Sequence, residues 1–151
     1  MLLPPDLFKS VIKNTPLISI DILFSNYRKE YLLGKRKNQP AKGFWFVPGG
    51  RVLKDETLEE AFRRICINEL GRAYDLAEAS FNGYYQHFYQ NNFFDDEFTT
   101  HYIVLSFRLS FGNDDINLPL DQHDDYCWLT KDSILNKKDV HKYTLDYFKD
   151  I

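Results

Sequence analysis

Glu69 is the residue whose type and position first point to chemistry. It follows Leu58 by 11 residues within TLEEAFRRICINELG. At roughly 100° per residue, this spacing places both residues on one helix face, which is otherwise apolar, while Glu56, Glu59 and Glu60 lie away from it. A carboxylate directed at a core is costly unless it is paired or binds a metal. Periodicity alone leaves two alternatives, a functional carboxylate or a frayed helix end at which Glu69 reaches solvent.

The segment around this helix has a regular spacing of glycine, acidic and basic residues. We expect two glycines before the helix, in PGG, to allow a tight turn with carbonyl oxygens facing inward. The segment then reads G-x5-E-x7-R, followed by x4, E, x and G, and its fixed residues are Gly50, Glu56, Arg64, Glu69 and Gly71. This pattern resembles the Nudix box. The resemblance implies an α+β fold, in which a mixed β-sheet is sandwiched between helices. It also implies cation-dependent hydrolysis of nucleoside diphosphates linked to another group.

The box departs from the family pattern where carboxylates are usual. Ile65 stands in place of a glutamate, and Asn68 replaces the first acid of the following pair. Arg72 replaces the last aliphatic residue. Only Glu56 and Glu69 remain as acids, which impairs the usual activation of water. The site therefore either binds without catalysis or obtains its base from elsewhere in the chain.

The segment DQHDDY, residues 121–126, offers such a base. Gln122 is a neutral oxygen donor for a cation, and His123 can accept a proton near neutral pH. The alternative is an ordinary polar loop. The depleted box together with this later histidine resembles the GDP-mannose mannosyl hydrolase branch of the Nudix superfamily. Matching segments cover nearly the whole chain: TPLISIDILF, LLGKR, GFWFVPGGRVLKDETLEEAF, QHFY, FTTHYIVLSFR and QHDDYCWLT.

The closer resemblance implies a reaction at carbon. Water attacks the anomeric carbon of GDP-mannose, with GDP-glucose as the alternative substrate, and the products are GDP and the sugar with inverted configuration. His123 is then the general base. The resemblance also implies a Mg²⁺ site, in which Mn²⁺ can substitute. Its ligands are the Gly49 carbonyl, the Glu69 carboxylate, the Gln122 side chain and the diphosphate. A homodimer is implied as well.

The resemblance assigns further residues to substrate binding. Arg36 and Arg51 contact the diphosphate and Tyr102 adds a hydrogen bond, so these three join His123 in the expected catalytic set. Asp21 and His87 contact sugar hydroxyls. Simpler explanations remain open: the arginines are surface charges, Tyr102 is a strand residue with a solvent-exposed hydroxyl, and His87 is a core residue. Asp21 is the hardest to explain without function, because a buried lone carboxylate needs a partner.

Two assignments are less specific. The resemblance places Phe8 as a ring that stacks on guanine, although an ordinary apolar contact is the simpler reading. It leaves Arg64 with two alternatives, since this residue either orients the site or adds positive charge to it.

The order of elements along the chain indicates how these residues are positioned. Alternating and β-branched segments predict strands over residues 17–24, 31–36, 44–47, 81–89, 101–111 and 126–129. Residues 31–36 are expected to pair with 17–24 as a hairpin. A helix is predicted from Thr57 to Gly71, with Leu58, Ala61, Phe62, Ile65 and Cys66 as its apolar stripe, and another over 140–148. Helices and strands in this order predict a mixed α+β sheet.

Length and composition limit the remaining possibilities. The chain has 151 residues, 44% of them hydrophobic, which predicts one globular domain over residues 1–151. A net charge of −3 argues against a nucleic-acid partner. The N-terminal segment has no secretory pattern and no apolar run is long enough to span a membrane, so a cytoplasmic protein with a small nucleotide-sugar substrate is expected. Two other functions stay open: a Nudix pyrophosphohydrolase that attacks phosphorus, and a silent nucleotide-sugar-binding module.

Overall fold

The computed structural model describes residues 3–111, 123–149 and 151, and for residues 123 and 124 it describes the backbone alone. The predicted ligand Gln122 lies outside these residues. The helices and strands follow in chain order: α1 Pro5–Asn14, β1 Leu17–Ser25, β2 Glu30–Arg36, β3 Trp45–Phe46, β4 Gly49–Arg51, α2 Leu58–Leu70, the 3₁₀ turn η1 Leu76–Glu78, β5 Ser80–Tyr89, β6 Thr100–Ser110, β7 His123–Thr130, α3 Lys131–Asn136 and α4 Lys142–Lys149.

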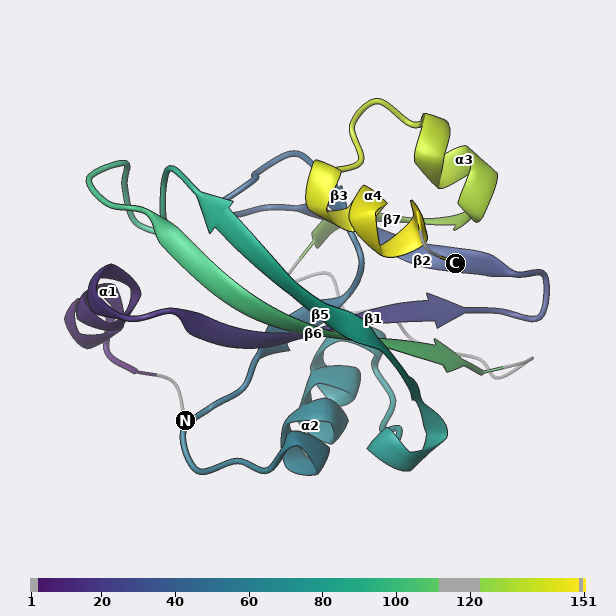
Figure 1. Ribbon diagram of the computed structural model, residues 1–151, viewed down its shortest axis with the longest axis horizontal. Coiled ribbons are helices and arrows are strands. Elements are labelled where there is room, and N and C mark those ends of the chain that lie inside the picture. Colours follow the sequence, from purple (N-terminus) through teal and green to yellow (C-terminus); the bar gives the residue numbers. More distant parts are fainter. Residues whose placement is uncertain (1–2, 112–122, 150) are drawn as a thin grey trace.

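The strands form one mixed sheet with β1 near its centre (Figure 1). β1 runs parallel to β6 from the pair Leu17–Tyr102 to the pair Ser25–Ser110, and β6 continues antiparallel to β5. The opposite side of β1 is shared, because β4 pairs with its first half and β2 meets it only at Ser25–Tyr31. The predicted hairpin of residues 17–24 and 31–36 is therefore correct only at its turn. β4 occupies the edge that β2 would need, and the long partner of β2 is β7.

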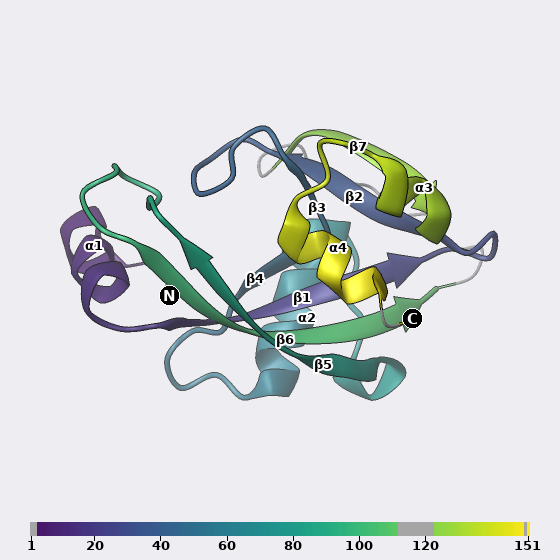
Figure 2. The same cartoon turned by 45° about the horizontal axis from the view of Figure 1, so that its top comes forward.

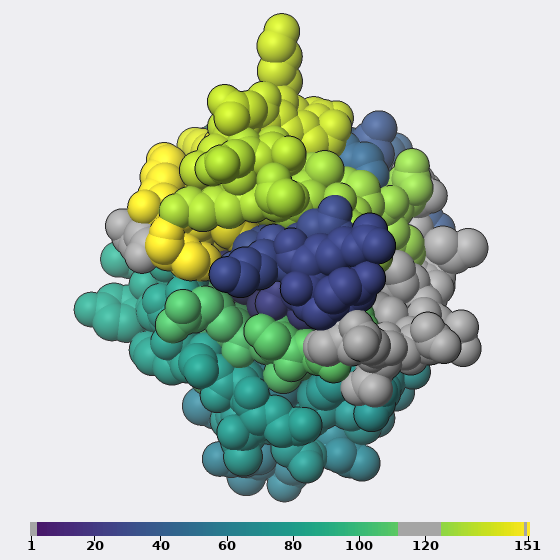
Figure 3. Space-filling view, turned by 90° about the vertical axis from the view of Figure 1, so that its right-hand side faces the viewer, coloured from purple at the N-terminus to yellow at the C-terminus, as the bar shows by residue number. Residues whose placement is uncertain are grey.

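Helices cover both faces of this sheet, as the family resemblance implies (Figures 1 and 2). α2 packs on one face, where its buried side chains join those of β1 and β6 in one core cluster. α3 and α4 pack on the other face, where Ile134, Tyr147 and Phe148 join a second cluster. At the surface the C-terminal helices lie beside the turn between β1 and β2 (Figure 3), and the ring of Tyr31 meets Phe148 edge-on at 4.9 Å. The predicted α+β sandwich is confirmed.

The box helix α2 begins and ends where its sequence predicts. The Thr57 side chain accepts a hydrogen bond from the Glu60 amide, and Gly71 follows the helix with φ of 73°, a left-handed conformation that favours glycine. The apolar stripe is buried except at Leu58, which is 39% exposed. Leu58 is the first residue of the helix, at the end where the sheet does not yet cover the apolar face, so the assignment of Leu58 to the buried stripe is wrong.

Alternation along β1 decides which core each side chain enters. Ile20, Ile22 and Phe24 face α2, so the odd-numbered residues of the same strand face the C-terminal helices. Leu23 belongs to the cluster of α3 and α4. Asp21 therefore points to the α4 face, in the middle of a strand that is covered on both sides. Helices α1 and α3 and strand β4 were not anticipated from the sequence.

In the ranges that the structure describes, none of the helices combines the length and apolar character needed to cross a bilayer.

Candidate functional site

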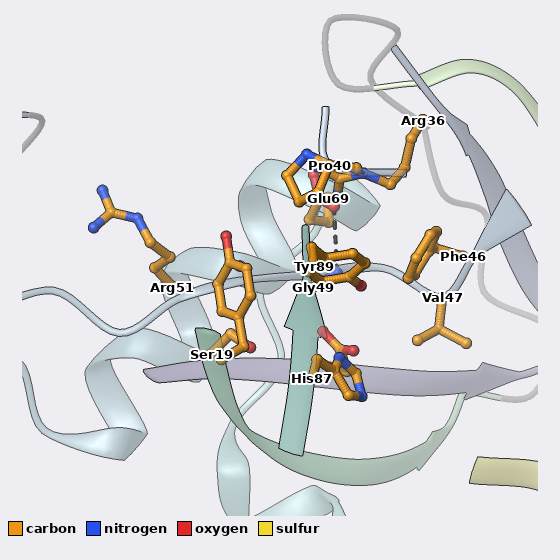
Figure 4. Close-up of a pocket in the computed structure, with 13 residues that line it drawn as sticks. Ser19, Arg36, Pro40, Phe46, Val47, Gly49, Arg51, Glu69, His87 and Tyr89 are labelled. Carbon is orange, nitrogen blue, oxygen red and sulfur yellow. Dashed lines mark hydrogen bonds between the residues drawn. The ribbon is translucent and has the colours of Figure 1, made fainter. Parts of the chain in front are cut away.

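Seven of the predicted site residues line one pocket on the α4 side of the sheet (Figure 4). They are Asp21, Arg36, Gly49, Arg51, Glu69, His87 and Tyr102. Figure 4 shows the two arginines on opposite sides of the pocket, with Tyr89, Gly49 and Glu69 between them. The residues that line the pocket come from seven elements, β1 to β6 and α2, and are separated by up to 83 positions between Ser19 and Tyr102.

Strand register explains how three of these elements deliver their side chains. Tyr102 on β6 is paired with His87 on β5, and directly paired residues share a face of the sheet. Tyr89 lies two residues beyond His87, so it projects from the same face. Ser19 and Asp21 project from β1 by the same alternation. The pocket is therefore built on β1, β6 and β5, with β4 and the end of α2 as its further wall.

Glu69 is buried at this wall, which decides between the two alternatives that helical periodicity left open. Its side chain is 7% exposed, and its Oε1 accepts a hydrogen bond from the Gly49 amide at 3.3 Å. Gly49 can make this contact because it is out of the β1–β4 hydrogen-bond ladder. The bonds from Ile22 N to Pro48 O and from Val52 N to Ile18 O flank it, so the pair Asp21–Gly49 is a non-hydrogen-bonded one. The amide and carbonyl of Gly49 accordingly point away from β1.

Gly49 is required for close approach rather than for a turn. The positive φ values of glycine in the described chain occur at Gly43, Gly71 and Gly83, whereas Gly49 belongs to strand β4. A Cβ on Gly49 would overlap the Asp21 carboxylate and would lie 2.7 Å from the Ile20 carbonyl oxygen. The expectation of a tight turn at the two glycines is therefore wrong, because extended backbone and the absent side chain are what let Asp21 fit here.

Asp21 has the partner that a buried carboxylate needs. Its Oδ2 accepts a hydrogen bond from the Tyr147 hydroxyl on α4. Burial raises the pKa of Asp21 to about 6, while the Tyr147 hydrogen bond and the charge of Arg36 oppose this rise. Glu69 is close enough to repel the ionised form. Asp21 is thus a charged acceptor at neutral pH, held where it can receive a hydrogen bond from a ligand hydroxyl.

His87 stands beside Asp21 in a fixed orientation. Its ring stacks on Tyr143 at 4.2 Å with only 3° between the planes, and its Nε2 lies 3.3 Å from the Tyr147 hydroxyl. Burial, with a contribution from His141, lowers the pKa of His87 to about 4. The imidazole is therefore neutral at physiological pH, so it offers one donor and one acceptor rather than a positive charge.

The two pocket arginines are oriented by their neighbours. Arg36 donates from Nε to the Pro40 carbonyl at 2.9 Å, and its guanidinium lies 5.5 Å from the ring centre of Phe46. Arg51 lies 4.2 Å from the ring centre of Phe8. Burial lowers the pKa of Arg51, but a guanidinium starts so far above neutrality that it remains charged. Two preoriented cations at one pocket favour a ligand with several negative charges.

Phe8 does not line the pocket. It reaches the site through Arg51, and on its other side it meets Phe94 edge-on at 5.9 Å. Its predicted contact with guanine remains untested.

Arg64 also lies outside the lining. Its guanidinium donates to both carboxylate oxygens of Glu56, at 2.7 and 2.9 Å, and to the Arg51 carbonyl at 2.6 Å. The pKa of Glu56 is lowered chiefly by this hydrogen bonding. Glu56 in turn accepts from the Leu53 amide at 2.8 Å. Arg64 thus holds the C-terminal end of β4, which carries Arg51, and this arrangement agrees with the orienting alternative.

The predicted base is located only by its backbone. His123 is the first residue of β7, and its Cα is in register with Arg36 on β2, a residue of the pocket. Its side chain and the whole of Gln122 are outside the described residues, so their predicted roles stay predictions.

Several pocket residues were not anticipated. Tyr89 and Phe46 give the pocket aromatic walls, and Tyr147 provides the partner of Asp21. The sequence places Tyr147 on the packed side of a terminal helix, which is correct, yet no local signal connects it with a strand 126 residues earlier.

The residues at Glu69 fit a divalent cation. A buried carboxylate and a backbone carbonyl released from its strand ladder are the hard oxygen donors that Mg²⁺ prefers, and both belong to the pocket wall. Among residues whose side chains are described, no three of His, Cys, Asp or Glu come together as metal ligands. A site here therefore needs oxygens from the backbone, from neutral side chains or from the ligand itself.

Fold and site together define a class of protein, in which a mixed sheet between helices carries a pocket lined by two arginines and two carboxylates. Residues 15–149 match the family model described as NUDIX domain, and the chain therefore belongs to the Nudix family. Nudix hydrolases act on small-molecule nucleotide substrates and generally use divalent ions such as Mg²⁺ or Mn²⁺.

Individual relatives agree with this assignment. The chain is 38% identical over 122 residues to the low-salt glycan biosynthesis protein Agl8 of Haloferax volcanii, an alignment that covers 80% of this chain and 75% of that protein. A MutT protein from Methanosarcina mazei is similar in structure, with a TM-score of 0.72, 25% identity and coverage of 91% and 94%. A MutT Nudix hydrolase from Burkholderia pseudomallei has the same fold, with a TM-score of 0.74, 22% identity and coverage of 91% and 99%.

Proposed function

We propose that this Nudix hydrolase converts GDP-mannose to GDP and mannose, by attack of water at the anomeric carbon with inversion; GDP-glucose is the alternative hexose substrate. The observation that carries the proposal is the division of the pocket. Charged guanidinium groups flank it, while Asp21 and neutral His87 lie together on the sheet. A diphosphate joined to a sugar has the same division, because its charge is on the phosphates and its hydroxyls are on the ring. The relation to a protein named for glycan biosynthesis supports a sugar nucleotide.

At the phosphate end, Arg36 and Arg51 bind the diphosphate and Tyr102 donates a hydrogen bond. All three line the pocket, and burial raises the pKa of Tyr102, so its hydroxyl keeps its proton. Their charges and dipoles stabilise GDP as it leaves with the electron pair of the broken C1–O bond. Phe8, which supports Arg51, stacks on guanine in this proposal.

At the sugar end, Asp21 accepts a hydrogen bond from one hydroxyl and His87 binds another. Both side chains are fixed by α4 before the substrate arrives, so little ordering is needed when the ring binds. Their negative and dipolar character also stabilises positive charge on the ring as C1 loses its leaving group.

Glu69, the Gly49 carbonyl and Gln122 hold the cation, in our proposal Mg²⁺ or Mn²⁺, together with the diphosphate. When bound, the ion neutralises charge on the phosphates and makes GDP a better leaving group. Glu69 is held for this role by the Gly49 amide, and its burial keeps water from competing for the carboxylate.

His123 accepts the proton of the attacking water. The oxygen of that water bonds to C1 while the C1–O bond to GDP breaks, and direct displacement inverts the configuration. What supports this assignment is the box itself, in which Ile65 is buried at 1% exposure where the family pattern has a catalytic carboxylate, so a base from another segment is required. The backbone register of His123 with Arg36 is compatible with that role.

Hydrolysis of GDP-mannose in ¹⁸O-water tests the proposal. Label in mannose supports attack at carbon, whereas label in the phosphate of the products indicates a pyrophosphohydrolase. Binding of GDP-mannose without turnover indicates a silent module. The His123→Ala variant should lose about 10²- to 10⁴-fold in kcat, the range of general-base catalysis, and the exposed neighbour Asp125→Asn should not. A kcat that is flat from about pH 5 to 9 would exclude His123 as the base, because an ordinary histidine titrates within that range.

A further inference from the structure

Tyr147 connects two pocket residues that come from separate strands. It is fully buried on α4, and its hydroxyl donates to Asp21 on β1 and lies 3.3 Å from Nε2 of His87 on β5. Strand β6 lies between β1 and β5, so neither residue is the other's direct neighbour in the sheet. We propose that Tyr147 is a positioning residue, whose hydroxyl joins Asp21 and His87 into one hydrogen-bonded unit and fixes how that unit meets a sugar ring. This rests on the proposed function.

Hydrogen-bond chemistry determines the order of protons in this unit. A tyrosine hydroxyl has one hydrogen, and an ionised carboxylate can only accept. Because that hydrogen goes to Asp21, the oxygen of Tyr147 is left as an acceptor, so His87 must donate to it from Nε2. His87 then has its proton on Nε2 and a free acceptor at Nδ1. The unit therefore has a single donor and acceptor pattern.

The packing around the unit holds each ring in place. Tyr143, one turn before Tyr147, lies flat on His87, and its hydroxyl is bonded to both the amide and the carbonyl of Phe88 at 2.9 and 2.8 Å. Tyr85 meets the ring of Tyr147 edge-on at 4.7 Å. The imidazole can neither tilt nor turn freely, so α4 orients residues of β1 and β5 together.

The main alternative is that Tyr147 is only a core residue. Phe148 shows what such a residue looks like, since it is just as buried on the same helix and has no polar atom. If Tyr147 had only this apolar role, its hydroxyl would contribute nothing to the positions of Asp21 and His87. This alternative predicts that loss of the hydroxyl changes stability and leaves the chemistry of Asp21 and His87 unaltered.

Tyr147→Phe removes the hydroxyl and keeps the ring, and Tyr74→Phe is the matched control, because Tyr74 is buried in the α2 cluster outside the pocket lining. With GDP-mannose, we expect Tyr147→Phe to lower kcat by about 10- to 100-fold, the usual effect of losing a residue that orients a functional group. Inhibition by GDP, which lacks the mannose ring, should stay within about twofold, and Tyr74→Phe should change neither quantity. An unchanged kcat in a folded Tyr147→Phe protein would overturn the proposal.

A spectroscopic measurement without substrate separates this inference from the proposed function. The ¹⁵N resonances of the His87 ring, assigned by their loss in His87→Gln, should show the proton on Nε2 at pH 8 in the wild-type protein and a changed tautomer balance in Tyr147→Phe. A proton on Nδ1 in the wild type refutes the unit, and this reading holds even when Tyr147→Phe does not fold. Absence of turnover in the wild type would instead refute the proposed function.

Discussion

The substitution Gly49→Ala tests the idea that an absent side chain shapes the pocket. An alanine Cβ at this position would overlap the Asp21 carboxylate and would lie 2.7 Å from the Ile20 carbonyl oxygen, where real Cβ contacts are at least 3.0 Å. Since the Ile20 oxygen belongs to the backbone of β1, β4 must move away by about 0.3 Å. Such overpacking typically costs about 1–3 kcal/mol.

The expected loss can be measured by thermal unfolding. For a domain of this length, about 1 kcal/mol corresponds to roughly 2–4 °C, so Gly49→Ala should lower Tm by about 2–12 °C. It should also lower kcat by about 100-fold, because the Asp21 carboxylate is displaced from its position in the pocket.

Gly50→Ala is the matched control. Its Cβ would lie 3.0 Å from a side-chain carbon of Ile65, which can yield by a few tenths of an ångström, and neither glycine has a positive φ. Both variants reduce the entropy of the unfolded chain equally, so their difference isolates the clash. If Gly49→Ala keeps the wild-type Tm and kcat, or if Gly50→Ala is the more damaged protein, the reasoning about close approach is wrong.

Two further predictions concern charge. Glu69→Gln should weaken Mg²⁺ affinity, as titration calorimetry can measure, because one negative charge beside the cation is lost; Glu59→Gln, exposed on the same helix, should not. Equal affinity in both variants would remove Glu69 from the cation site. Stability should fall as the pH drops from about 6.5 to 4, because the pKa values of His87 and His141 are lowered to about 4 by burial and the unfolded chain takes up their protons first. Asp21 opposes this fall, because its pKa is raised to about 6 and its protonation therefore favours the folded state. Urea unfolding of the wild-type protein and of His87→Gln across this pH range measures the net change in the free energy of unfolding. A free energy of unfolding that rises towards pH 4 would contradict it.

Most of the strands, helix α2 with its two ends, and the chemical character of the site could be predicted from the sequence, whereas α1, α3 and β4 could not. Thr57, Glu60 and Gly71 mark the ends of α2 because capping depends on residues a few positions apart. Helical periodicity placed Glu69 on the apolar face of α2 but left open whether it reaches solvent, and its 7% exposure in the structure shows that it is buried. Asp21 could be recognised as a carboxylate in need of a partner, since alternation along a strand is equally local.

Tertiary structure decided which distant residues meet. β2 pairs mainly with β7 rather than with β1, because β4 competes for the same edge, and competition between segments leaves no trace in the local pattern of any one of them. The partner of Asp21 is Tyr147, brought across the sheet by the packing of α4. Gly49 needs to be glycine because of a carboxylate on another strand, and not because of its own backbone angles. Local propensity is set by neighbours in sequence, whereas a pocket is set by neighbours in space, so only the folded chain could show how these residues work together.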